Sequence, residues 1–149
     1  MPSRAAQHRR YVRRVLVGVT GPASPDRAQL AEAFDTLCDR MRAQLYPLFG
    51  ATATDALFAR GLHLATSEFP WLAGVVPKTT QRCASEGLAA LHPELPPEQI
   101  GDGLTAVLAH TFGLLTAFIG LDMTLPLVEQ AWGVAASADD QSDTTVTYE

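Results

Sequence analysis

The spacing of apolar residues predicts helices along most of the chain. The clearest pattern starts near Pro25, with Ser24 as the capping residue, and it ends at Gly50. In between, large apolar residues recur at intervals of three and four, as on one face of a helix: Leu30, Phe34, Leu37, Met41, Leu45 and Leu48. We therefore expect a helix over about residues 25–48.

The opposite face of this helix carries Asp35, Asp39 and Arg42, which we expect to face solvent. A second amphipathic helix is predicted over about 54–68. Its last residue, Glu68, is unusual because its position on the helical wheel lies within the apolar stripe. A charged residue at such a position is a candidate for a functional role.

Pro70 ends the second helix and is followed directly by Trp71. Two interpretations of Glu68 stay open: its carboxylate extends into solvent from the last turn, or it lies beside Trp71 at the mouth of a cleft. The proline-rich stretch that follows is irregular, with one or two short helices expected within 70–92.

The longest uncharged stretch is 103–121, which has an acidic residue at each end and predicts a central helix over about 97–119. Its length is borderline for a membrane span, but no Lys or Arg flanks it and His110 interrupts it. We interpret it as the core helix of a soluble bundle, covered on every side. Its bulky face comprises Ile100, Leu104, Val107, Leu108, Thr111, Leu114, Leu115, Phe118 and Ile119.

Small residues on the reverse side of the central helix, at Ala109, Gly113 and Ala117, would let a neighbouring backbone approach closely. That neighbour is either another helix of the chain or a second copy of it. A final helix is predicted over about 124–133, capped by Thr124, with Pro126 still in the first turn. Its buried edge would comprise Leu121, Leu125, Val128 and Trp132.

These elements predict an all-α fold, a single-domain bundle of four main helices. The bundle itself is expected to occupy 24–133. Residues 1–23 would form a flexible basic arm, and 134–149 an acidic disordered tail.

The composition agrees with one folded domain. The chain has 149 residues, of which 47% are hydrophobic and 18% charged. Cys38 and Cys83 show neither metal-ligand spacing nor a disulfide framework, which indicates a reducing compartment. The N-terminus lacks the apolar run of a secretory signal, so we expect a cytoplasmic location.

Charge is distributed unevenly along the chain. Five arginines precede the first acidic residue: Arg4, Arg9, Arg10, Arg13 and Arg14. Without them, the net charge of −5 becomes −10. The arm could therefore contact an anionic membrane, a nucleic acid or an acidic partner. The acidic bundle is not expected to bind nucleic acid, because phosphate contacts need a positive surface.

The histidines are too scattered for a metal cluster, with no HxxxH or ExxH pair. His110 has two interpretations. It is a neutral core histidine bonded to a carbonyl or a threonine, or it is the ligand of a haem or another small molecule in an apolar pocket. His110, Glu68 and Trp71 are thus the candidate residues of a ligand or partner site.

The segment Ala109-His110-Thr111-Phe112, with Gly120 ten residues beyond the histidine, resembles the motif of histidine-containing phosphotransfer domains. Those domains are helical bundles whose histidine exchanges a phosphoryl group with response-regulator aspartates. The resemblance implies that role for His110. The lysine and glycine that the family carries next in its motif are replaced here by Gly113 and Leu114.

No nucleophile–base pair, metal cluster or phosphate-binding loop is recognisable in the sequence. We therefore expect a non-enzymatic interaction or regulatory module that binds another protein or associates with itself. The alternatives are a bundle that binds haem or another small molecule near His110, and a phosphotransfer-like signalling domain.

Overall fold

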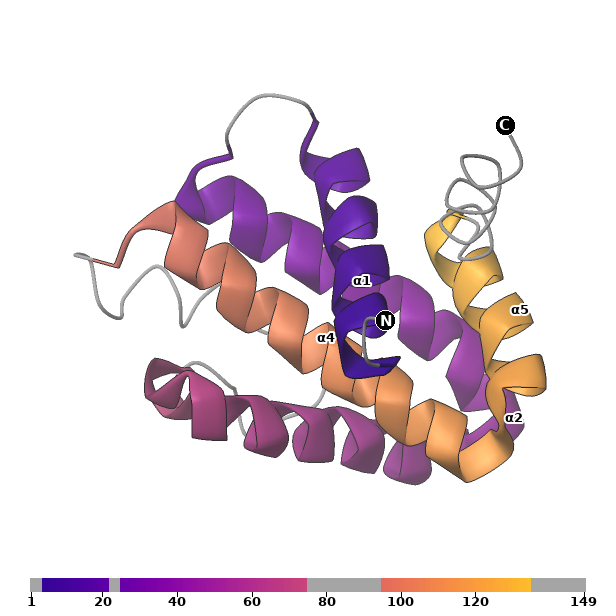
Figure 1. The fold of residues 1–149 in the computed structure, drawn as a ribbon. Coiled ribbons are helices and arrows are strands. Elements are labelled where there is room, and N and C mark those ends of the chain that lie inside the picture. The colour runs from indigo at the N-terminus through magenta and orange to yellow at the C-terminus, as the bar shows by residue number, and fades with distance from the viewer. Residues whose placement is uncertain (1–3, 22–24, 75–94, 135–149) are drawn as a thin grey trace.

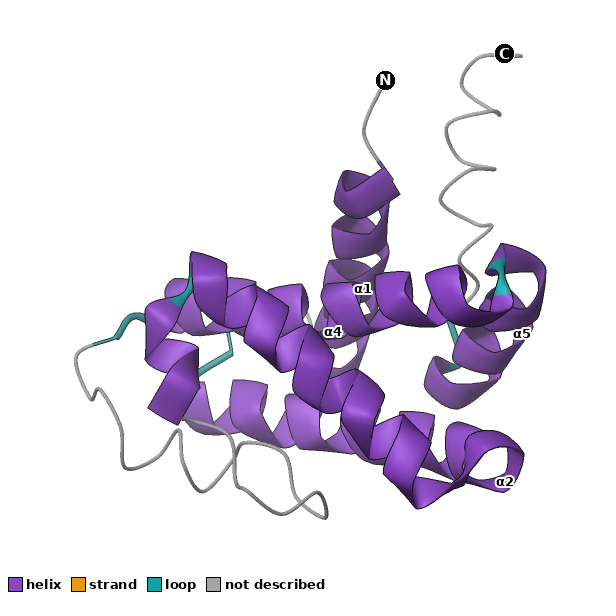
Figure 2. Ribbon diagram, turned by 90° about the horizontal axis from the view of Figure 1, so that it is seen from below, coloured by secondary structure: helices purple, strands orange, loops and turns teal. Residues whose placement is uncertain are grey.

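The computed structural model describes residues 4–21, 25–74 and 95–134. The fold is all-α, as the sequence predicts, and the described residues contain no strand (Figures 1 and 2). The elements are α1 (Arg4–Thr20), α2 (Arg27–Glu68), a 3-10 turn η1 (Pro70–Gly74), α4 (Pro97–Ile119) and α5 (Leu121–Trp132). Ser24, residues 75–92 and the tail from 135 lie outside the described residues.

The predicted helices 25–48 and 54–68 are the two segments of α2, which bends at Gly50. Gly50 has φ +84° and ψ 164°, a conformation that glycine adopts more easily than other residues. The first segment starts slightly later than expected because Asp26 is its N-cap. The Asp26 carboxylate accepts from the Gln29 N–H, and the Gln29 side chain accepts from the Asp26 N–H.

The bend of α2 buries a charge that the sequence predicts to be in solvent. Arg42 is only 8% exposed. Its guanidinium lies 3.3 Å from Asp39 Oδ1, 3.6 Å from Asp55 Oδ1, and over the ring of Phe58 at 5.0 Å. Asp55 and Phe58 come from the second segment, so Arg42 is covered only because α2 folds back on itself. The prediction of a solvated Arg42 was therefore wrong.

Helix α4 has the predicted bounds and runs between the two segments of α2 (Figure 1). Helices α1, α2 and α5 all contact it. By length and composition alone α4 could cross a membrane, but 56% of its most apolar window is buried inside the protein. Burial by neighbouring helices favours the interpretation of α4 as a core helix.

Close approaches to α4 occur at three glycines. Gly61 of α2 lies against the Thr111 side chain and the Val107 carbonyl, and Gly103 lies under the Trp71 ring. Gly113, on the predicted small-residue side, faces His8 of α1. The neighbour on that side is thus a helix of the same chain, although Ala117 further along is exposed.

Helix α1 packs on the bundle and does not form the flexible arm that we expected. Tyr11, Val12, Val15 and Leu16 are at most 4% exposed and belong to the core. Their spacing produces an apolar stripe among the arginines, and burial of that stripe against α4 and α2 outweighs the charge of the segment. The bundle therefore begins before residue 24.

Helix α5 begins at Leu121, not at Thr124. Thr124 is buried inside the helix, where its hydroxyl donates to the Gly120 carbonyl at 2.8 Å. Pro126 consequently lies in the second turn. Leu121 is 40% exposed instead of forming part of the buried edge, whereas Trp132 at the other end is buried as predicted.

Two hydrogen bonds join the end of α5 to distant helices. Trp132 Nε1 donates to the Leu37 carbonyl of α2 at 3.0 Å, and the Tyr11 hydroxyl of α1 donates to the Val134 carbonyl at 2.7 Å. Burial, with the nearby Glu129 carboxylate, raises the pKa of Tyr11 above its ordinary range. Tyr11 therefore remains a neutral donor at physiological pH.

Candidate functional site

Three helices bring Arg9, Glu68 and His110 together in one charged cluster. Arg9 Nη2 of α1 lies 2.7 and 2.6 Å from the two carboxylate oxygens of Glu68, at the end of α2. His110 Nε2, midway along α4, lies 2.8 Å from Glu68 Oε2. Glu68 is thus the centre of the cluster and accepts from both partners.

The protonation of the cluster follows from its donors and acceptors. An ionised carboxylate can only accept, so a hydrogen of His110 is assigned to Nε2, which donates it to Glu68. The contact of 3.5 Å between Arg9 Nη2 and His110 Nε2 then joins two donors and is a proximity only. Hydrogen bonds from Arg9 and then His110 lower the pKa of Glu68.

The structure places two of the three predicted site residues together. The side chain of His110 is 28% exposed, and its partner is a carboxylate rather than the carbonyl or threonine expected of a core histidine. The side chain of Glu68 is 39% exposed, but it is held by two partners and does not extend unpaired into solvent. Glu68 was identified because it lies within an apolar stripe, and His110 because it interrupts the uncharged stretch 103–121.

Trp71 lies apart from this pair. Its indole ring packs over Gly103, which is two helical turns, or about 10 Å at 1.5 Å per residue, from His110 along α4. The Trp71 Nε1–H is buried and has no hydrogen-bond partner among the described residues. Of the two interpretations of Glu68, the one that places its carboxylate beside Trp71 is therefore not supported: the partners of Glu68 among the described residues are Arg9 and His110.

Arg9 is the member of the cluster that the sequence analysis missed. Arg9 precedes Val12 and Leu16 by three and seven residues, so it extends the apolar stripe of α1. A basic residue on one buried stripe and an acidic residue on another, Glu68, could have suggested a pair. Because residues 1–23 were expected to form a flexible arm, no partner in the bundle was expected for Arg9.

A shallow groove of about 290 Å³ borders the cluster. It is lined by His8, Arg9, Leu64, Ala109, His110, Gly113 and Leu114. The lining includes no Ser, Thr or Cys, so the groove lacks a hydroxyl or thiol nucleophile that His110 could activate. The polar side chains of the lining, on His8, Arg9 and His110, offer hydrogen bonds and charge.

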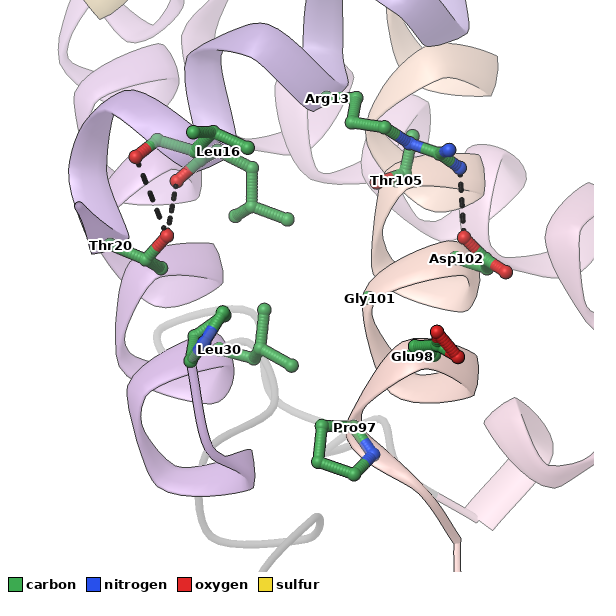
Figure 3. A pocket seen from close by; sticks show the side chains of 11 residues that line it. Arg13, Leu16, Thr20, Leu30, Pro97, Glu98, Gly101, Asp102 and Thr105 are labelled. Atoms are coloured by element: carbon green, nitrogen blue, oxygen red, sulfur yellow. Dashed lines mark hydrogen bonds and ion pairs between the residues drawn. The ribbon is translucent and has the colours of Figure 1, made fainter. Parts of the chain in front are cut away.

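A second hollow of about 470 Å³ lies between α1, the start of α2 and the start of α4 (Figure 3). Leu16 and Leu30 form its apolar wall, facing Gly101 of α4. At its rim, Arg13 Nη2 donates to Asp102 Oδ1 at 2.8 Å. Both side chains are about half exposed, so this pair contributes little to stability.

No family model, curated protein or solved structure matches this chain. Among the described residues, no three His, Cys, Asp or Glu side chains gather as a metal site would require. The functional proposal therefore depends on the geometry of the chain itself.

The most exposed apolar side chains of the described residues include a group at one end of the bundle, where α2 bends at Gly50 and α4 meets α5 (Figure 1). Phe118 is 63% exposed, Met123 59%, Leu48 56% and Leu121 40%. The ring of Phe49 packs against that of Phe118 at 5.6 Å and joins the two corners. We call these five residues the corner surface.

The corner surface was not predicted, since Leu48 and Phe118 fall on apolar stripes that the sequence assigns to the core. A stripe identifies the inward side of a helix but not where its neighbours end. At Gly50 and Gly120 the chain turns with φ near +84° and +88°, so the adjoining helix leads away and leaves the last turn uncovered.

We expect the stability of the protein to depend on Glu68 at acidic pH. Because its folded-state pKa is lowered, Glu68 contributes stability above its ordinary value of 4.5, and this contribution is lost as the pH falls through the lowered pKa. Glu68→Gln should remove the part of the pH dependence of stability that the Glu68 carboxylate causes. At neutral pH it should cost no more than about 1 kcal/mol, because the carboxylate is partly exposed.

Urea unfolding between pH 3 and 7 measures this effect. The control is Glu32→Gln, which removes an exposed carboxylate from the same helix without affecting the cluster. If the unfolding free energies of Glu68→Gln and the wild type changed equally with pH, Glu68 would not be held by Arg9 and His110 in solution.

Proposed function

We propose that this chain is a non-enzymatic helical interaction module that binds another protein, or a second copy of itself, through the corner surface. The exposure of four large apolar side chains at one end of the bundle supports the proposal. Scattered exposed apolar residues are normal, but a contiguous group marks an interaction site in many proteins.

The energetics of hydration favour a partner on this surface. Burying a Phe, Leu or Met side chain completely contributes about 1.5–3 kcal/mol. Each of the four exposed side chains stays about half exposed after folding, so roughly half of that free energy remains to be gained on binding. The Phe49–Phe118 contact holds two of the rings in place before binding, so less side-chain entropy is lost on association. A partner that covers the corner surface would gain both advantages.

The geometry around His110 supports haem or small-molecule binding less well. Iron ligation through Nε2 would require His110 to leave Glu68, which would cost a hydrogen bond to a charged group. The adjacent groove of about 290 Å³ is at the lower limit of small-molecule sites. The residues present therefore do not fit a haem in this arrangement.

The phosphotransfer alternative meets a similar difficulty. The Nε2 atom of His110 is engaged by Glu68, and a carboxylate at 2.8 Å would repel an incoming phosphoryl group. Arg9 supplies a positive charge nearby, but that charge is already paired with the same carboxylate. The cluster is better suited to fastening α1 to the bundle.

The proposal is tested with the double variant Phe118→Ser and Met123→Ser, compared with the wild type and with Val17→Ser. Val17 is 52% exposed on α1, outside the corner surface, and serves as the matched control. Sedimentation equilibrium measures self-association. A pull-down from the source cells, read by mass spectrometry, measures binding to other proteins.

We expect the wild type and Val17→Ser to form an oligomer or retain a partner, and the double variant to lose it. The double variant should unfold at a similar temperature, because both replaced side chains are already in solvent. A wild type that stays monomeric and retains no partner would contradict the proposal, as would a double variant that binds normally.

A further inference from the structure

The hollow between α1, α2 and α4 lies at the start of α4, whereas the corner surface lies at the end of that helix (Figures 1 and 3). Its volume of about 470 Å³ is within the usual range of small-molecule sites, and it exceeds the groove of about 290 Å³ beside His110. Leu16 of α1 and Leu30 of α2 give it an apolar wall. The hollow therefore has the size and the apolar lining that a small ligand requires.

Gly101 of α4 leaves this hollow open where the packing would allow a side chain. A Cβ atom at Gly101 would lie 3.8 Å from Leu30 Cδ2, which is an ordinary van der Waals distance. At Gly103, in contrast, a Cβ atom would clash with the Trp71 ring. Glycine destabilises a helix relative to alanine, so position 101 gives up stability without a gain in packing. A binding site that must stay open accounts for that loss.

Two carboxylates and one guanidinium border the hollow. Glu98 and Asp102 are about one turn apart on α4, and Arg13 lies across from them on α1. Arg13 pairs with Asp102 at 2.8 Å, whereas the Glu98 side chain has no hydrogen bond or ion pair with another described residue. At the start of α2, Asp26 and Arg27 lie outside the lining and have opposite charges. The described lining therefore keeps one unpaired negative charge.

An anion fits this charge distribution less well than a cation. The amino end of a helix attracts anions through its free N–H groups. Here the first residue of α4 is a proline without an N–H, and the N–H groups of Gln99 and Ile100 donate to the Pro96 carbonyl. Glu98 adds a negative charge to the same turn. Arg13, the one basic side chain of the described lining, is already held in an ion pair.

We propose that the hollow binds a small cationic amphiphile, such as an alkylammonium ion. Its alkyl chain lies against Leu16 and Leu30, and its ammonium group donates to the Glu98 carboxylate, which can only accept. The exposed pair of Arg13 and Asp102 contributes little to stability, so it can rearrange around the head group at little cost. This site is independent of the corner surface and of the proposed function.

Three probes with the same alkyl chain test the preference for a cation: octylammonium, octanoate and 1-octanol. Each is titrated into the isotope-labelled full-length protein, and its affinity is measured from the amide NMR signal of Thr105, which lines the hollow. The amide signal of Gly120, at the far end of α4, should not move. We expect octylammonium to bind about fivefold or more tightly than octanoate, with octanol between them, because a charge attraction replaces a repulsion.

Variants of the protein show whether the probe occupies the hollow. Gly101→Leu should fill it and weaken octylammonium binding about tenfold or more. Gly18→Leu is the matched control, because Gly18 lies outside the lining and nothing is within 4 Å of its Cβ position. Glu98→Gln should remove most of the preference for octylammonium over octanoate. Asp122→Asn, which removes an exposed carboxylate from α5, should leave that preference unchanged.

Four results would each overturn the inference: no binding of octylammonium, equal affinity for octylammonium and octanoate, binding that survives in a folded Gly101→Leu variant, or a preference that Glu98→Gln does not change. Circular dichroism checks that each variant is folded. If Gly101→Leu does not fold, the comparison of Glu98→Gln with Asp122→Asn decides. The sedimentation and pull-down experiments on the corner surface are separate, so the proposed function can fail while this site holds, or the reverse.

Discussion

Phe112→Ala is expected to destabilise the protein by about 3–5 kcal/mol, the range for truncating a buried aromatic residue. Phe112 is 2% exposed. Its ring stacks on His8 at 4.5 Å and meets the edge of Tyr11 at 5.8 Å. The substitution would therefore leave a cavity where α1 packs on α4. Urea unfolding followed by circular dichroism measures the loss.

Phe118→Ala is the matched control, because Phe118 lies on the same helix but is 63% exposed. We expect its effect to be within about 0.5 kcal/mol of zero. Similar losses for the two variants would show that Phe112 is not in the core and that α1 does not cover α4.

Gly61→Ala is expected to destabilise the protein by about 1–3 kcal/mol through overpacking. A Cβ atom at Gly61 would meet the Thr111 side chain, and it would lie 3.1 Å from both the Thr111 backbone nitrogen and the Val107 carbonyl oxygen. The two backbone atoms can move only if α4 moves. This clash should outweigh the gain of about 1 kcal/mol that alanine brings to a helix interior.

Gly18→Ala measures the stabilisation that the higher helix propensity of alanine provides when no clash opposes it. Gly18 lies in α1, and nothing is within 4 Å of the position that its Cβ would occupy. We expect Gly18→Ala to stabilise the protein by about 0.5–1 kcal/mol in the same urea experiment. If Gly61→Ala were stabilising as well, α2 and α4 would not be in contact at this point.

The candidate site could be recognised in part from the sequence. Glu68 lies within an apolar stripe and His110 interrupts the longest uncharged stretch, and these local irregularities identified both. Their pairing could not be predicted, because they are 42 residues apart and no local pattern specifies which helix faces cross. Arg9, 59 residues before Glu68, was missed because its segment was taken for an arm.

Burial was harder to predict than helix position, and the errors have one cause. Arg42 lies on a polar face but is covered by the second segment of α2, whereas Phe118 lies on an apolar face but extends beyond its neighbours. Residue spacing identifies the side of a helix. Whether another helix covers that side depends on where the chain turns.

The sequence by itself determined the helical class, the limits of α4 and the inward face of most helices. These properties follow from backbone hydrogen bonds and from a repeat of 3.6 residues, which act between neighbours in the chain. Only the tertiary structure decided that α1 joins the core, that Glu68 holds Arg9 and His110, and that a group of apolar side chains stays in solvent. Those outcomes depend on crossings between distant segments, where the bends at Gly50 and Gly120 place one helix against another or leave it uncovered.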